Sequence, residues 1–214
     1  MTVAGDAVLE YRSDMHEVLG PARTPALRTP DVVVLATTLA TVAYGQNCKP
    51  VDSQALKYFQ LEIVFGGEEF KTWQDGTNCC TWDGVTCNGN GNVESLNIVA
   101  KDVPAARPQG DPYLVGTALG DLVGLKNLTM LNVAYNGQIP PAWGGLANLE
   151  VLNLDGCNVV GSIPEELCRL GNLHTLILKG NFISGSAPEC LSSLSLSSLD
   201  LSGNQLSGSV PSIP

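Results

Sequence analysis

The residues best suited to chemistry are the cysteines of the stretch TNCCTWDGVTC, which runs from residue 77 to residue 87. Cysteine sulfur can bind a metal ion, cycle between redox states or form a disulfide. A zinc site needs four ligands, but this stretch has no C-x-x-C spacing and no histidine lies near it. The sequence therefore predicts neither a metal site nor a cofactor here. What the cysteines do must be inferred from the elements around them.

Charge and composition narrow the classes of function. The chain has only two histidines, His16 and His174, and no nucleophile–base arrangement or phosphate-binding loop. Its formal net charge is −10, so it lacks the basic face that nucleic acids and anionic membranes require. Hydrophobic residues make up 44% and charged residues 15% of 214 positions, which suits one or two folded domains. These features predict a folded protein that is not an enzyme and does not bind nucleic acid.

The first long apolar run, VVVLATTLATVA at residues 32–43, is typical of the hydrophobic part of a secretory signal. Its 12 residues are too few for a membrane span, which needs about 20. We interpret residues 1–45 as a signal-peptide-like targeting segment with a long n-region, which a start at Met15 would shorten. The alternative is a buried strand or helix of a small N-terminal domain.

The C-terminal half repeats the pattern L-x-x-L-x-[LV]-x-x-[NC] four times. The central leucines are spaced by 21, 24 and 23 residues and are Leu131, Leu152, Leu176 and Leu199. A degenerate earlier copy contains Leu96 and is followed by an irregular insertion at residues 103–116. Because L-x-L alternates, each copy predicts a short strand with one face inward. One such strand cannot bury its own leucines, so the copies are expected to stack around a shared core.

The last position of each pattern is expected to point into the stack. It is predicted to be Asn136, Cys157, Asn181 and Asn204. A buried amide without a partner is unfavourable, so the asparagines are expected to bond backbone groups of their own and neighbouring turns.

After this position the copies continue with GQIP, GSIP, GSAP and GSVP. The repeat and its tail resemble the leucine-rich repeat in its plant-type version. The resemblance implies an α/β solenoid of about four to five leucine-rich repeats at residues 93–214. It also implies a disulfide-bonded helical N-terminal cap at residues 46–92 and no evident C-terminal cap. The first copy reads NGQIP where NxLxGxIP is usual in the family, so we expect it to lack three residues and to turn more tightly.

The predicted cap begins with a helix. Asp52 is expected to be its N-cap, because a carboxylate can accept hydrogen bonds from the free amides of the first turn. Apolar residues recur at roughly helical spacing after it: Ala55, Leu56, Phe59 and Ile63. The resemblance implies that Trp73 and Trp82 pack on the first repeat. It further implies two disulfides, Cys48–Cys79 and Cys80–Cys87, which would stabilise an element too small for a large core of its own.

Three further cysteines lie in the repeats. Aligning the copies places Cys168 and Cys190 on neighbouring return segments, close enough for a disulfide, with two buried thiols as the alternative. Cys157 remains as a free, buried thiol. Three disulfides require an oxidising compartment, so we expect a secreted protein or one at the cell surface or cell wall. The sequon NLT at Asn127 predicts glycosylation on an exposed turn just before a strand.

The exposed positions of the stacked strands predict one concave, polar and mildly acidic face. The residues expected to bind a ligand there are Asn132, Tyr135, Asn153, Asp155, His174 and Lys179. Tyr135 and Met130 are expected to be large anchors on this face, because aromatic side chains dominate binding hot spots. The alternative is a solvated sheet surface without a ligand.

The family resemblance implies a non-catalytic extracellular recognition module in defence or signalling, with a protein, peptide or oligosaccharide as partner. Two alternatives stay open. One is a polygalacturonase-type enzyme inhibitor, against which the small number of repeats argues; the other is a structural cell-wall or surface-coat protein. The sequence ends within the array at SGSVPSIP, so we expect the last repeat to be covered by further repeats, a partner or a second copy.

Overall fold

The computed structural model describes residues 47–63, 70–100, 115–209 and 211. The chain divides into two units, residues 1–42 and residues 43–214, and every described element belongs to the second. The predicted targeting segment and most of the predicted insertion at residues 103–116 therefore lie outside the described residues. Within the described part, no helix combines the length and the apolar character needed to cross a membrane.

The described part of the N-terminal cap contains an α-helix, a short 3-10 helix and an antiparallel pair of strands. Helix α1 spans Pro50–Glu62 and the 3-10 helix η2 spans Cys79–Thr81. Strand β1, Val85–Cys87, pairs antiparallel with strand β2, Val93–Val99. An antiparallel pair needs only a short connecting turn, so the cap leads directly into the first strand of the repeats.

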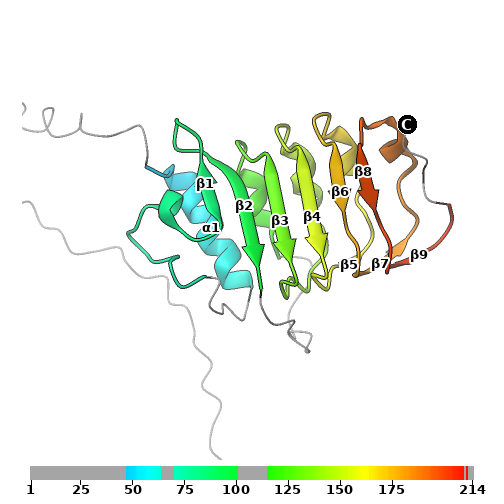
Figure 1. Cartoon of the computed structure of the whole chain (residues 1–214), viewed down its shortest axis with the longest axis horizontal. Coiled ribbons are helices and arrows are strands. Elements are labelled where there is room, and N and C mark those ends of the chain that lie inside the picture. Colours follow the sequence, from blue (N-terminus) through cyan, green and yellow to red (C-terminus); the bar gives the residue numbers. More distant parts are fainter. Residues whose placement is uncertain (1–46, 64–69, 101–114, 210, 212–214) are drawn as a thin grey trace, which may run out of the picture. The chain divides into compact units, whose positions relative to one another are not determined.

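The repeats build one parallel sheet. Its six strands lie in the order β1-β2-β3-β4-β6-β8, and from β2 onward all neighbours are parallel (Figure 1). The remaining strands of this sheet are β3 Asn127–Leu131, β4 Val151–Asp155, β6 Thr175–Ile177 and β8 Ser198–Asp200. A second sheet has three short strands, β5 Val160–Gly161, β7 Phe182–Gly185 and β9 Gln205–Leu206.

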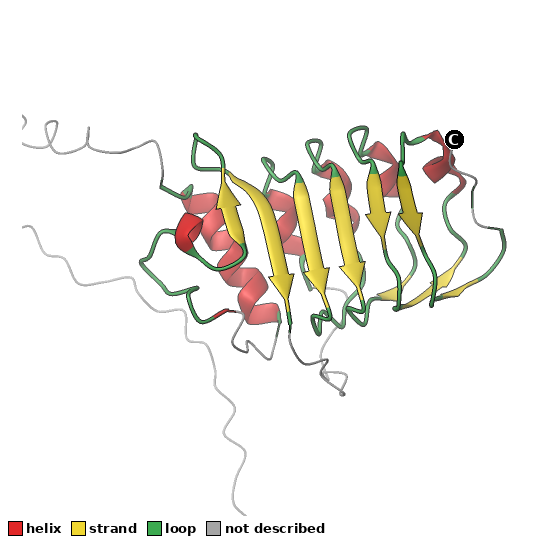
Figure 2. Ribbon diagram, in the orientation of Figure 1, coloured by secondary structure: helices red, strands yellow, loops and turns green. Residues whose placement is uncertain are grey.

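Each repeat returns to the next strand through a short 3-10 helix behind the large sheet (Figure 2). These helices are η3 Thr117–Asp121, η4 Pro141–Gly145, η5 Glu165–Arg169 and η6 Glu189–Ser193. They pack in series after α1. Gly144 permits the close approach of η4 to η5, because a Cβ atom at that position would clash with the backbone carbonyl of Glu166. The helices and the inner side of the sheet enclose one continuous core.

The centre of the core is a column of leucines in strict strand register. Leu96, Leu128, Leu152 and Leu176 are paired across neighbouring strands, and all four are fully buried. Leu199 continues the column on β8 but is only half-buried. The stacking that the repeat pattern predicts is confirmed, since each leucine is covered by the equivalent residue of the next strand.

The predicted register of the first clear repeat was wrong by three residues. Leu128, not Leu131, pairs with Leu152, and Leu131 pairs with Asp155. The segment NLTML offers two leucines three positions apart, and both fit the pattern. With Leu128 as the central residue the repeat spacings become 24, 24 and 23, as follows from the paired leucines. No residues are therefore missing from this repeat.

The same shift removes Asn136 from the inward position. Val133 occupies that position in this repeat, and it is buried as Cys157 and Asn181 are in the next two. Asn136 lies three residues further on in a left-handed turn (φ 54°), where its amide donates to the carbonyl oxygen of Ala134 at 2.8 Å. Asparagine tolerates this backbone conformation better than most residues.

The expected asparagine bonds are present at Asn181. Its Oδ1 accepts hydrogen bonds from the backbone amides of Cys157 at 3.0 Å and Val159 at 2.9 Å. Its Nδ2 donates to the carbonyl oxygens of Leu154 at 2.7 Å and Leu178 at 2.8 Å. One side chain thus satisfies buried groups of two successive turns. Asn204 makes three of these four bonds one repeat later, to Ile183, Leu178 and Leu201, in a more exposed setting.

The predicted N-cap role of Asp52 is wrong. Lys49 occupies the N-cap position, and no side chain caps this helix end. Asp52 lies inside the first turn and is buried, and its Oδ2 accepts a hydrogen bond from the backbone amide of Val93 at 2.7 Å. The carboxylate therefore joins the cap helix to the first residue of β2. Burial raises the pKa of Asp52 above its ordinary value of 3.8, although the Val93 amide and Lys49 favour the ionised form.

We expect Asp52→Asn to remove a pH dependence from the free energy of unfolding. The pKa of Asp52 is higher in the folded than in the unfolded chain. Ionisation of this carboxyl therefore lowers the free energy of unfolding of the wild type as pH rises from 3.8 through the pKa of the folded state. Asparagine keeps an oxygen for the Val93 amide but has no charge to bury. Urea unfolding at a series of pH values should show that the free energy of unfolding of Asp52→Asn, relative to that of the wild type, increases toward neutral pH. Asp52→Ala should be less stable than Asp52→Asn throughout, and parallel pH curves for wild type and Asp52→Asn would contradict the assignment.

Candidate ligand-binding face

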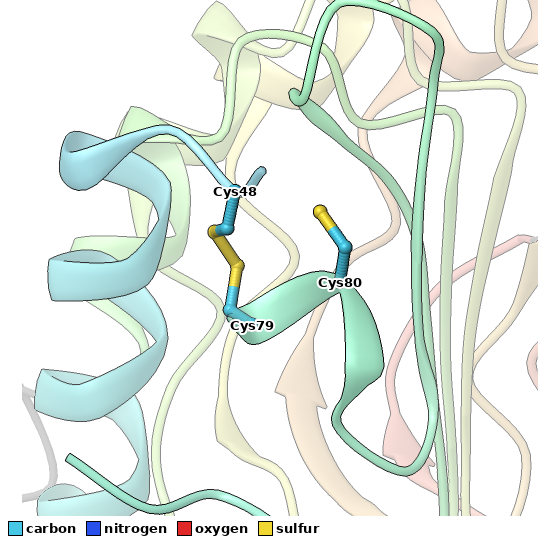
Figure 3. A group of neighbouring side chains, drawn as sticks. All are labelled: Cys48, Cys79 and Cys80. Carbon is cyan, nitrogen blue, oxygen red and sulfur yellow. A yellow bond between two sulfur atoms is a disulfide. The ribbon is translucent and has the colours of Figure 1, made fainter. Parts of the chain in front are cut away.

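The cysteines are structural. The three predicted disulfides are present, with Cα–Cα distances of 5.3 Å for Cys48–Cys79, 5.4 Å for Cys80–Cys87 and 5.8 Å for Cys168–Cys190. The sulfurs of Cys48, Cys79 and Cys80 lie within 4.8 Å of one another, a cluster that resembles a metal site (Figure 3). All three are already bonded to another sulfur, so none is a free thiolate ligand. This part of the chain is a cross-linked cap.

Cys157 is the free thiol, as predicted, and it is buried. Burial raises its pKa to about 12. Its sulfur lies 3.2 Å from the carbonyl oxygen of Met130, to which the thiol donates. A thiol that stays protonated and inaccessible is a poor nucleophile, so Cys157 serves as a small core residue.

Aromatic rings fill the cap between the disulfides and the repeats. Trp73 stacks on Trp82 with ring centroids 5.3 Å apart, and Phe70 meets Trp73 edge to face at 4.8 Å. Both tryptophans are buried in the same core as Leu96 and Ile98 of β2, which agrees with the predicted packing on the first repeat. The cap thus covers apolar side chains that the first repeat would otherwise expose.

The large sheet presents one face that the short helices do not cover, and we call it the open face. Along each strand the buried core residues alternate with residues that point to this face. Its first row is Ser95, Asn127, Val151, Thr175 and Ser198. Its second row is Asn97, Thr129, Asn153, Ile177 and Asp200. Its third row is Val99, Leu131 and Asp155, which Lys179 and Ser202 continue beyond the ends of β6 and β8.

Four of the six predicted ligand-binding residues lie on or beside the open face. Asn153 and Asp155 are half-buried within β4, and Lys179 is exposed just after β6. His174 is exposed immediately before β6, and its Nε2 lies 3.9 Å from a carboxylate oxygen of Glu150. These four residues lie on or beside the neighbouring parallel strands β4 and β6, with His174 and Lys179 at opposite ends of β6.

Two of the predicted ligand-binding residues lie elsewhere, and so does the predicted anchor Met130. Tyr135 is 1% exposed and Met130 is fully buried, so neither can be an anchor on the face. Asn132 is exposed but lies in a left-handed turn beyond β3 (φ 55°), at the position that Gly156 and Gly180 occupy in the next repeats. All three errors have one cause, because a shift of three residues turns inward positions outward.

Tyr135 instead joins three segments of the fold. Its hydroxyl lies 2.8 Å from the carbonyl oxygens of both Val115 and Gln138, and its ring packs against Trp143. Burial raises its pKa well above the ordinary value, and Glu62 raises it further. Trp143 donates from Nε1 to the carbonyl oxygen of Gly116 at 2.8 Å. These bonds hold the segment that re-enters the repeats at Val115.

The structure adds Thr129 and Leu131 to the open face, whereas the predicted residue Asn132 lies beyond the strand. The signal that would have found them is Met130, whose long apolar side chain can replace the second core leucine of the repeat. With Met130 inward, Thr129 and Leu131 must point outward, because side chains alternate along a strand.

At the open face and its edge, some charged groups are paired and others are not. Lys126 and Glu94 form an ion pair at 2.6 Å, which raises the pKa of Lys126. The Ser202 hydroxyl donates to Asp200 at 2.6 Å and its amide at 3.0 Å, and together with Lys179 these bonds lower the pKa of Asp200. Within the described residues, no ion pair joins Asp155 to Lys179 across the adjacent strands. The face therefore offers both unpaired charge and half-buried apolar side chains.

Comparison with known proteins agrees with this architecture. Residues 50–88 match the model of the leucine rich repeat N-terminal domain, and residues 147–206 match the leucine rich repeat model. The described part of the chain is thus a leucine-rich-repeat solenoid with an N-terminal cap domain. Its resemblance to plant-type leucine-rich repeat ectodomains, predicted from the sequence, is confirmed by the relatives that follow.

Two relatives come from Arabidopsis thaliana. The chain is 34% identical over 97 residues to the LRR receptor-like serine/threonine-protein kinase RGI3, with 45% of this chain and 8% of that protein covered. It is 37% identical over 113 residues to Receptor-like protein 7, with 44% of this chain and 11% of that protein covered. The matches therefore span only a small fraction of the length of these relatives.

Among solved structures, a plant ice-binding protein superposes with a TM-score of 0.61 at 26% identity, covering 75% of this chain and 50% of that one. The Arabidopsis receptor kinase HAESA, solved with the peptide hormone IDA and the co-receptor SERK1, gives 0.57 at 27% identity. That match covers 76% of this chain and 27% of the HAESA chain. Pollen Receptor Kinase 3 shares the fold, with a TM-score of 0.60 at 22% identity and 76% of each chain covered.

Proposed function

We propose that this chain is a non-catalytic extracellular recognition module, acting in signalling or defence, that binds a protein or peptide through the open face. The proposal rests on the arrangement of side chains on the open face. Five neighbouring parallel strands present polar and apolar side chains in register, and none of these is needed for the core. The three disulfides support an oxidising, extracellular location.

The size of the face suits one such partner. Neighbouring strands lie about 4.8 Å apart, so five strands extend over roughly 20 Å. A standard interface buries about 800 Å² on each partner, which a face of this size with its flanking turns can supply. The similarity to HAESA supports a peptide or protein partner, because that protein was solved with a peptide hormone and a co-receptor.

Electrostatics favour a partner with positive charge. The whole chain has a net charge of −10, and at the open face and its edge the carboxylates of Glu94, Glu150, Asp155 and Asp200 outnumber the ammonium groups of Lys126 and Lys179. A field of one sign accelerates the approach of an oppositely charged partner and is screened by salt. We therefore expect association to slow as ionic strength rises.

We expect Ile177→Arg to weaken binding of peptides selected on the wild-type protein. Ile177 is half-buried at the centre of the second row, where desolvated contacts contribute most to affinity. Peptides panned from a random displayed library against immobilised residues 46–214 should bind this variant about tenfold or more weakly, as is typical of a central contact.

The matched control is Val123→Arg. Val123 is 62% exposed in the loop after η3, away from the open face, and the substitution adds the same charge and similar bulk. Peptides selected on the wild type should bind this control as they bind the wild type. Selected peptides that tolerate Ile177→Arg but lose binding to Val123→Arg would place recognition elsewhere and overturn the proposal.

Ice binding is a second candidate, favoured by the superposition on a plant ice-binding protein. The regular spacing of the repeats also produces rows of small polar side chains on the open face, such as Ser95, Thr129 and Thr175. Thermal hysteresis and ice-shaping of the purified protein test this candidate directly. Hysteresis that disappears in Ile177→Arg but not in Val123→Arg would replace the peptide-binding proposal.

A further inference from the structure

The glycosylation sequon lies within the sheet and not on a turn. Asn127 is the first residue of β3, and it pairs with Ser95 of β2 and Val151 of β4. Leu128 and Met130 of the same strand are fully buried. Because side chains alternate along a strand, Asn127 and Thr129 both point to the open face. The sequence predicted this asparagine on an exposed turn just before the strand, and that part of the prediction is wrong.

The Asn127 side chain leaves its nitrogen available. Its Oδ1 accepts a hydrogen bond from the Thr129 hydroxyl at 2.7 Å, whereas its Nδ2 has no protein partner among the described residues. No side-chain nitrogen or oxygen in that part of the chain is both buried and unpartnered, so this Nδ2 is exposed to solvent. Asn181 and Asn204 differ, because their Nδ2 atoms donate into the stack of repeats.

We propose that Asn127 carries an N-linked oligosaccharide that covers the part of the open face formed by β2, β3 and β4. In the modification, Asn127 Nδ2 bonds to the anomeric carbon of a lipid-pyrophosphate-linked oligosaccharide. The bond from that carbon to the pyrophosphate breaks, the lipid pyrophosphate leaves with the bonding electrons, and one amide proton is released. The donor and the transferase belong to the secretory pathway, which the disulfides already indicate.

The position of the sugar has a consequence for recognition, and this step rests on the proposed function. Val151 is one strand from Asn127, whereas Ser198 is three strands away, at roughly 14 Å for a spacing of about 4.8 Å. A bulky, hydrated sugar chain therefore excludes a protein surface first from β2 to β4. The contact area left for a partner lies around Ile177 on β6, Lys179 just after β6 and Asp200 on β8.

The first experiment measures occupancy without any partner. The full chain is secreted from eukaryotic cells, and its mass is determined before and after enzymatic removal of N-glycans. Thr129→Ser keeps the sequon and should retain the oligosaccharide mass at Asn127, whereas Thr129→Ala should lose it. A wild-type chain that is folded and secreted with unmodified Asn127 would overturn the proposal.

The second experiment measures coverage, again without a partner. Single cysteines are introduced by Val151→Cys, Ser198→Cys and Ser192→Cys, and their reaction with a bulky polymer-linked maleimide is timed. Ser192 lies on η6 behind the sheet and is the control for the opposite side. Cys157 contributes little background, because it is buried and its pKa is about 12.

In the glycosylated protein, Val151→Cys should react several-fold more slowly than after glycan removal. The effect should be smaller for Ser198→Cys and absent for Ser192→Cys. Equal rates at Val151→Cys with and without the glycan would overturn the covering role, even if Asn127 is occupied. Neither experiment uses a ligand, so their failure is separate from a failure of the peptide-binding proposal.

Discussion

Replacing Asn181 with alanine is expected to lower the free energy of unfolding by about 3–5 kcal/mol, because each buried group left unpaired costs roughly 1–3 kcal/mol. Asn181 is 4% exposed, and its amide is the acceptor for two backbone N–H groups and the donor to two buried carbonyls. Alanine leaves these groups in an apolar interior without water. Urea denaturation followed by tryptophan fluorescence measures the change.

Asn204→Ala is the matched control, since Asn204 makes three of the four equivalent bonds at the last described repeat. Its side chain is only part-buried, so water can replace the lost partners and the expected cost is about 1 kcal/mol. A loss for Asn181→Ala no larger than that for Asn204→Ala would show that burial does not control the strength of these bonds. In that case the inward asparagine would be a local turn former only.

Removing the Cys48–Cys79 disulfide by a double alanine substitution is expected to cost about 3–4 kcal/mol, given the 31-residue separation and the entropy of closing such a loop. The bond anchors the start of α1 to η2, and Cys79 is fully buried, so alanine avoids burying a new polar group. Without the bond the cap should open first, exposing the core residues of β2. Hydrogen exchange at β2 should accelerate before exchange at β4.

The Cys80–Cys87 bond provides the comparison within the same cap. It closes only 7 residues, and the same relation gives about 2 kcal/mol for its removal. Both double variants should be measured by urea unfolding under identical conditions. If removal of the shorter cross-link costs more than removal of the longer one, then native-state contacts, and not loop closure, determine what these disulfides contribute.

Asn181 and the cap disulfides both stabilise the interior of the fold. Bonds to several neighbouring segments hold these groups in place. The side chains of the open face, in contrast, are supported only by the sheet beneath them. A surface whose side chains are not needed for folding can change without loss of the fold. The same scaffold can thus present different ligand-binding residues from one protein to another.

The amino-acid sequence by itself was sufficient for much of this description. Leucines spaced by 21 to 24 residues predicted a stacked solenoid, because a strand with a two-residue period buries its leucines only against the next copy. The three disulfides also followed, two from the resemblance of the cap and one from the alignment of Cys168 with Cys190. These features depend on the spacing of residues along the chain, which can be read from the sequence without knowing the fold.

Only the tertiary structure decided the register of the repeat that contains β3. Leu128 and Leu131 both satisfy the local pattern, and the choice depends on whether Met130 or Val133 fills the second core position. Stacking on Leu96 and Leu152 selects Leu128, because parallel strands pair residue by residue and a buried column cannot change its offset in one repeat. That choice buries Tyr135 and brings Asn127 onto the open face.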